Sequence, residues 1–204
     1  MDDQRLPVEL VETVQELEAE LRRKNEELNY LSRELQALKT MLKNESFKDE
    51  LTGLYNKLAI ESILHYKKHR SDRSKKPFSI LLVDISGLDK INQEYGRAAG
   101  DKVLTDFAKR LIVSLRAEDA IARWGDDKFI AVLSDCYYVD AEVVAKKIQF
   151  FVKDWEVPLE HTLLDYAVRI GISQYNQGET LPTLMERAEV NLRIEKDKKD
   201  VFKK

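Results

Sequence analysis

The residues best suited to chemistry lie in one short stretch, 116–129. Its centre is Gly-Asp-Asp-Lys at 125–128, between two apolar runs, and this pattern is typical of a β-hairpin tip. Carboxylates are good ligands for hard cations, and a lysine offsets the charge of a phosphate. Just ahead of the first apolar run stand Arg116 and Asp119. Because a planar guanidinium beside a carboxylate suits a flat polar ligand, the stretch predicts two neighbouring charged sites.

The elements that position these groups can be predicted from hydrophobic periodicity. The run Phe78–Asp84 holds five apolar residues and predicts a buried central strand that ends at the Asp84 carboxylate. Ser86 is expected to cap the helix that follows, which runs to about Tyr95. Helices interleaved with strands and one hairpin predict an α+β domain with a central mixed sheet flanked by helices. Further helices are expected at 58–69, 103–115, 141–153 and 181–196, and one or two strands at 163–175.

The first 46 residues predict a different kind of helix. Residues 8–45 contain no glycine or proline, and apolar residues recur there at alternating steps of three and four. A repeat of about 3.5 residues is typical of a coiled coil, which requires a second chain, so we expect a homodimer. The alternative is an amphipathic helix packed on its own domain. The repeat consists of Leu10, Val14, Leu17, Leu21, Leu28, Leu31, Leu35, Leu38 and Leu42.

The expected organisation is a coiled-coil helix at 1–46, one globular domain at 47–199 and a tail at 200–204. The net charge of −3 and the lack of a basic tract give no reason to expect nucleic acid as a partner. No apolar run approaches the roughly 20 residues that span a bilayer. The single cysteine, Cys136, cannot form a disulfide within the chain, which fits a reducing cytoplasm.

Four spaced motifs resemble those of the GGDEF family, the diguanylate cyclases that join two GTP molecules into cyclic di-GMP. The motifs occupy Asp49–Asn56, Leu82–Asn92, Gly96–Asp101 and Arg123–Phe129, in the family's order and spacing. The resemblance covers about residues 47–199. It implies a fold similar to the palm of nucleotide cyclases and polymerases, and a bacterial signalling protein.

The resemblance also implies roles for individual residues. Asp84 and Asp127 match carboxylates that bind Mg²⁺, provided that a nucleoside triphosphate and its metal are bound at all. Asn92 and Asp101 match the pair that reads guanine. Lys196 matches a lysine on the final helix that binds phosphate.

The signature itself departs from the family pattern, so none of its remnants is expected to be catalytic. Gly125 and Asp127 are retained, but Asp126 replaces the second glycine and Lys128 replaces the following acid. The lysine that is expected after the first strand is Asp89. A carboxylate close to a phosphate is strongly repelled, so we expect synthase activity to be lost and no cofactor to be required. Compared with the family pattern, Asp89 stands where a lysine is expected and Lys128 stands where an acid is expected. The two opposite substitutions preserve the local charge, so the side chains could pair as a salt bridge. The alternative is that both are surface residues of a site that is no longer under functional constraint.

Arg116 and Asp119 match the family's inhibitory RxxD site, at which cyclic di-GMP binds as a stacked dimer. The arginine stands nine residues before Gly125. The guanidinium matches guanine or phosphate, and the carboxylate can accept from guanine N1 and N2. The alternative for this short motif is a plain surface ion pair.

The function predicted from these observations is that of a degenerate GGDEF protein, a dimeric receptor that binds cyclic di-GMP and relays its presence to an unknown protein partner. One alternative is a diguanylate cyclase with residual activity. Another is a dimeric interaction scaffold that binds GTP or no ligand.

Overall fold

The computed structural model of the chain describes residues 8–43, 47–153, 155–159 and 162–200, and the side chains of 14–34, 47–153, 155–159 and 162–195. The chain divides into two units after Glu45, and each is described by itself. Residues 1–7 and 201–204, which belong to the predicted coiled-coil segment and tail, lie outside the described residues. None of the described helices combines the length and apolar character needed to cross a membrane.

The first unit contains one uninterrupted helix, α1 (Val8–Lys43). Its apolar repeat is exposed to solvent, with Leu21 and Leu28 at 62% and 63% exposure. Continuous helix agrees with the absence of glycine and proline from this segment. Four members of the predicted repeat, Leu10, Leu35, Leu38 and Leu42, have side chains outside the described part of the structure.

The second unit is built around a four-stranded sheet in the order β2-β3-β1-β6. All three pairings between neighbouring strands are antiparallel. We expected a mixed sheet; among the described residues, the only parallel pairing is one bridge between Tyr55 and Ala122, at the β2 edge. The strands are β1 (Phe78–Ser86), β2 (Ala120–Arg123), β3 (Lys128–Ser134) and β6 (Ala167–Gln174).

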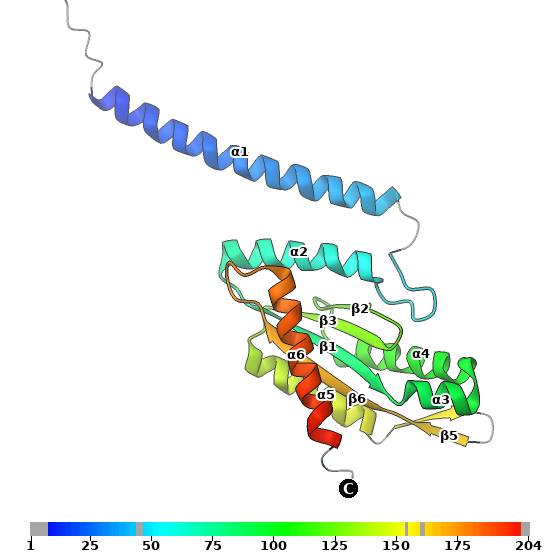
Figure 1. Cartoon of the computed structure of the whole chain (residues 1–204). Helices are drawn as coiled ribbons and strands as arrows, with labels where there is room; N and C mark the ends of the chain where they lie inside the picture. Colours follow the sequence, from blue (N-terminus) through cyan, green and yellow to red (C-terminus); the bar gives the residue numbers. More distant parts are fainter. Residues whose placement is uncertain (1–7, 44–46, 154, 160–161, 201–204) are drawn as a thin grey trace, which may run out of the picture. The chain divides into compact units, whose positions relative to one another are not determined.

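Helices cover both faces of this sheet, so two hydrophobic clusters sandwich it (Figure 1). Leu81 and Val83 of β1 face α3, α4 and α5, whereas Ile80 and Leu82 face α2 and α6. This explains why β1 is apolar on both faces at 80–83: a strand buried on both faces needs no polar alternation. The helices are α2 (Lys57–Ser74), α3 (Leu88–Tyr95), α4 (Arg97–Ser114), α5 (Tyr138–Lys153) and α6 (Leu181–Asp200).

A small hairpin, β4 (Glu156–Leu159) and β5 (Thr162–Asp165), precedes β6. The predicted strand region 163–175 is therefore divided between β5 and β6. Gly171 of β6 lies directly against α6, since a Cβ there would come within 2.1 Å of the Ala188 carbonyl oxygen. Only glycine permits this close approach of helix and sheet.

Two local predictions are wrong. Ser86 does not cap the helix after β1: the N-cap of α3 is Gly87, which has φ +87° and makes no side-chain capping bond. Glycine takes this left-handed conformation without steric cost. The helix predicted from 103 begins earlier, at Arg97, so Asp101 lies inside α4 rather than ahead of it.

Candidate functional site

The tip of the β2–β3 hairpin is held by Arg123. Its Nε donates to the Gly125 carbonyl at 3.2 Å, and its Nη2 donates to the Asp126 carbonyl at 3.0 Å. Its Nη1 lies 3.3 Å from Asp49 Oδ2, in a partly buried ion pair. The predicted hairpin is present, but the tip needs no residue with positive φ. One arginine thus joins the segment before α2 to the backbone of the tip.

These contacts shift the pKa of the Asp49 carboxyl. Burial alone would raise its pKa, but hydrogen bonds from the side chain and backbone of Thr52 and the charge of Arg123 outweigh burial and hold the pKa below its ordinary value. The two Thr52 bonds measure 2.6 and 2.9 Å. Asp49 is therefore a charged anchor for the turn.

Basic residues lie next to Asp84, one of the two residues predicted to bind a metal ion. Asp84 is buried, with 2% exposure, near the end of β1. Its cross-strand partners are Lys128 of β3 and Arg169 of β6. Arg169 Nη1 lies 4.0 Å from Asp84 Oδ2. Asp127 lies outside β3, where its carbonyl accepts from the Ile85 N–H at 3.0 Å.

These residues do not fit a magnesium ion. Mg²⁺ requires oxygen ligands, whereas lysine and arginine offer only donors and repel a cation. Within the described ranges, no group of three or more acidic, histidine or cysteine side chains is placed to hold a metal. The suggested salt bridge between Asp89 and Lys128 is also not formed among the described side chains: Lys128 Nζ instead lies 3.4 Å from Asp127 Oδ1.

The predicted guanine pair is brought together on adjacent helices. Asn92 lies on α3 and Asp101 on α4. A Cβ at Gly100 would come within 2.0 Å of Asn92 Oδ1, so the asparagine packs onto α4 immediately beside Asp101. Asn92 Oδ1 is buried without a hydrogen-bond partner in the described structure. An unsatisfied buried acceptor is suited to a donor on a ligand. Lys196 lies in α6, but its side chain is outside the described part.

The RxxD motif forms a tight turn between α4 and β2. The Asp119 N–H donates to the Arg116 carbonyl at 3.1 Å. In return, Asp119 Oδ2 accepts from the Arg116 N–H at 3.1 Å, and Oδ1 accepts from the Ser134 N–H at 2.9 Å. The two motif residues form no side-chain ion pair within the described structure, and the Arg116 side chain is exposed. Asp119 therefore organises the turn, and Arg116 is presented to solvent.

A pocket of about 500 Å³ lies beside this turn. Arg116 and Asp119 line it together with Lys147 of α5, whose Nζ donates to the Ser114 carbonyl at 3.2 Å. Val143 and Val144 supply an apolar wall. Sequence reasoning missed Lys147, because no local motif marks it and its position depends on how α5 packs on α4. The pocket thus combines two cations and an apolar wall with three carboxylates, because Asp135 and Asp140 line it as well as Asp119.

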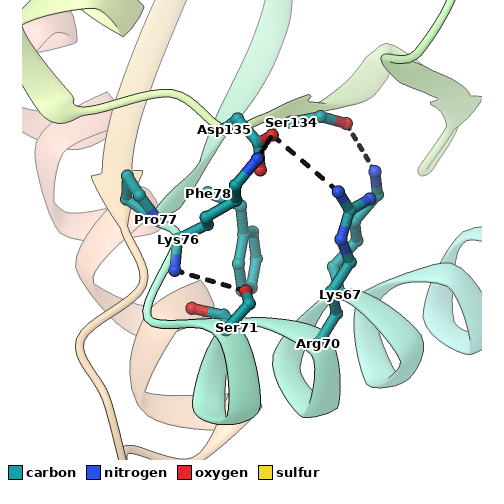
Figure 2. A pocket seen from close by; sticks show the side chains of 9 residues that line it. Lys67, Arg70, Ser71, Lys76, Pro77, Phe78, Ser134 and Asp135 are labelled. Carbon is teal, nitrogen blue, oxygen red and sulfur yellow. Dashed lines mark hydrogen bonds and ion pairs between the residues drawn. The ribbon is translucent and has the colours of Figure 1, made fainter.

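A second, smaller pocket also includes Ser134 and is lined by three basic side chains, Lys67, Arg70 and Lys76 (Figure 2). Lys76 Nζ and Arg70 Nη2 lie 3.0 and 3.8 Å from Asp135 Oδ2. Lys67 Nζ donates to Ser134 Oγ. Burial lowers the pKa of Lys67, and the neighbouring charge of Arg70 lowers it further. The hydrogen bond from Lys76 holds the pKa of Asp135 below its ordinary value.

Ser134 connects the two pockets. Its N–H binds Asp119, its Oγ donates to the Glu118 carbonyl at 2.7 Å, and the same Oγ accepts from Lys67 of α2. The RxxD turn is thus linked by hydrogen bonds to the first helix of the domain.

Comparisons with known proteins identify the family of this chain. Residues 46–200 match the family model described as diguanylate cyclase, GGDEF domain. The response regulator PleD of Caulobacter vibrioides is 33% identical over 144 residues, which are 69% of this chain and 32% of PleD. Diguanylate cyclase A of Treponema denticola is 34% identical over 125 residues, which are 61% of this chain and 34% of that protein. The chain spans about a third of the length of these relatives.

A solved structure of the diguanylate cyclase SiaD with its activator SiaC, from Pseudomonas aeruginosa, has a TM-score of 0.74 and 25% identity over 94% of this chain and 74% of SiaD. The fold accordingly agrees with the palm-like architecture that the motifs imply. With a family match that spans most of its length, the chain belongs to the GGDEF-domain family of diguanylate cyclases.

Proposed function

We propose that this protein is a homodimeric cytoplasmic receptor for cyclic di-GMP that has lost the ability to synthesise it. The observation that carries the proposal is the RxxD turn, in which Asp119 is fixed by two backbone N–H groups while Arg116 is exposed at a pocket shared with Lys147. A pre-formed turn lowers the entropic cost of binding.

Arg116, Lys147, Asp119 and the apolar wall match the chemistry of this ligand, whereas Asp135 and Asp140 add negative charge to the same lining. Cyclic di-GMP carries two phosphates and two guanines, and Arg116 and Lys147 supply two cations. A carboxylate has about four acceptor sites, so Asp119 can bind its two backbone donors and still accept from guanine N1 and N2. The apolar wall from Val143 and Val144 offers a surface for a base.

The departures in the signature support the proposed loss of synthesis. Asp126 places a carboxylate where the family has glycine near phosphate, and Lys128 stands beside Asp84 where an acid is expected. Since the residues around Asp84 do not fit Mg²⁺, metal-assisted attack of one GTP on another has no support there.

Dimerisation through α1 is supported by its exposed apolar repeat. Heptad-spaced leucines in water favour association with a second helix. A protein partner is in keeping with SiaD, whose solved structure is a complex with its activator SiaC.

A second candidate function is a GTP-binding scaffold. It is favoured by one observation, the buried and unpartnered Asn92 Oδ1 beside Asp101. Micromolar binding of GTP without product, lost on Asn92→Ala, would support it.

The experiment that tests the receptor is titration of the purified chain and two variants, Arg116→Ala and Lys147→Ala, with cyclic di-GMP. Each variant removes one charged contact, which typically costs about 1.5–3 kcal/mol, or roughly ten- to a hundredfold in affinity. Lys109→Ala is the matched control, because it removes an exposed cation of α4 that does not line the pocket. Equal affinity in all four proteins would rule out this site.

A further inference from the structure

Three charged residues form a row across the end of the sheet. Lys128 of β3, Asp84 of β1 and Arg169 of β6 are cross-strand partners. Residues directly opposite each other in antiparallel strands project from the same face, with Cβ atoms about 5 Å apart. Asp84 therefore has a basic residue opposite it on each neighbouring strand.

Arg169 is the cation whose side chain lies beside the Asp84 carboxylate. Its Nη1 lies 4.0 Å from Asp84 Oδ2, and its side chain is 22% exposed. Its Nε is fully buried. The guanidinium is thus largely buried next to the Asp84 carboxylate.

The burial of Asp84 explains why a cation is needed. A buried carboxylate is stable only when a counter-charge accompanies it, and breaking such a pair leaves an uncompensated charge. In a metal site the ion supplies that charge. Here the neighbouring strands supply it, and Asp127, the other predicted metal ligand, lies outside the row with its carboxylate beside Lys128.

We propose that Arg169 and Lys128 take the place of a divalent cation beside Asp84, so that this centre is closed to metals and its integrity does not depend on one. The proposal goes beyond the receptor function, since it concerns residues that do not line the RxxD pocket. On this proposal, metal binding is lost because of residues within the sheet itself. Substitution of Arg169 is therefore the way to test it.

Metal binding tests the proposal directly. Mn²⁺ is titrated into the full chain up to about 1 mM, the weak end of protein affinities for hard divalent cations, and bound ion is read by electron paramagnetic resonance. We expect no stoichiometric site in the unaltered protein. We expect one site in the double variant Arg169→Ser/Lys128→Glu, which removes both cations and adds a carboxylate opposite Asp84. Arg193→Ser, which removes an exposed arginine of α6, is the control and gains no site.

Melting temperature gives the second measurement. The unaltered protein is expected to melt at the same temperature in Mg²⁺ and in EDTA, whereas Mn²⁺ stabilises the double variant through linkage. If the double variant does not fold, Arg169→Ser alone is measured, and it is expected to gain weak Mn²⁺ binding.

One Mn²⁺ per unaltered chain that disappears on Asp84→Asn would overturn the proposal. A folded double variant that gains no site would also overturn it. Cyclic di-GMP titrated into the same samples reports on the RxxD pocket, so failure here is distinguishable from failure of the receptor function.

Discussion

The Ser134 N–H donates a hydrogen bond of 2.9 Å to Asp119 Oδ1, and this bond fixes the RxxD turn to the end of β3. The other carboxylate oxygen accepts from the Arg116 N–H at 3.1 Å. The acid of the motif is therefore a structural residue as well as a prospective ligand contact, and the two roles can be separated by experiment.

Asp119→Asn is expected to lower the free energy of unfolding by about 1–3 kcal/mol, because an amide can accept only one of the two backbone hydrogen bonds. Urea unfolding followed by circular dichroism measures the change. Asp140→Asn, at an exposed position that lines the same pocket, is the control and is expected to have little effect. Equal stability of both variants would show that the two bonds do not hold the turn.

The clamp between Asp49 and Arg123 predicts a pH dependence. Since the folded state holds the pKa of Asp49 below its ordinary value, the clamp's stabilisation is present above the unfolded pKa of about 3.9 and is lost as pH falls through the lower, folded pKa. Asp49→Asn is expected to cost about 1 kcal/mol at pH 7 and less at pH 3, as measured by urea unfolding at each pH. An identical cost at both values would contradict this account.

Cys136 is expected to react slowly with thiol reagents. Burial raises the pKa of its thiol to about 11, with smaller contributions from Asp140 and Asp119. At pH 8 about one thiol in a thousand would be ionised, on the order of a hundredfold fewer than for an unperturbed cysteine. Labelling of the native protein with a chromogenic disulfide, followed from pH 7 to 10, checks this expectation. Complete reaction within the mixing time at pH 7 would contradict it.

The coiled-coil proposal is tested by a charge in the apolar repeat. Leu28→Asp places a carboxylate at the predicted seam and is expected to convert a dimer into a monomer. Ala19→Asp adds the same charge at an outward heptad position and is expected to leave the dimer intact. Light scattering coupled to size exclusion measures both masses. A monomeric unaltered chain, or a dimeric Leu28→Asp variant, would refute dimerisation through α1.

Much of the fold was predictable because its signals are local. The apolar run that becomes β1 and the segment of α1 without glycine or proline both show in the sequence. The boundary of α4 was missed, since Gly96 starts the helix as well as ending α3. A glycine is typical of a helix end, so the sequence alone did not indicate that a second helix begins at the same residue.

The charged contacts were less predictable, because they depend on register and packing. Arg169 becomes the partner of Asp84 only when β6 aligns with β1, because position 84 lies far from position 169 along the chain. Lys147 reaches the RxxD pocket only because α5 packs beside α4. No spacing rule connects such distant residues in a single sequence.

The most direct test of the receptor account is one calorimetric titration of the unaltered chain with cyclic di-GMP, paired with a product assay in GTP and Mg²⁺. The account predicts binding in the micromolar range, about −8 kcal/mol, and no cyclic di-GMP formed. Product formation, or no heat of binding at protein concentrations well above that range, would contradict it.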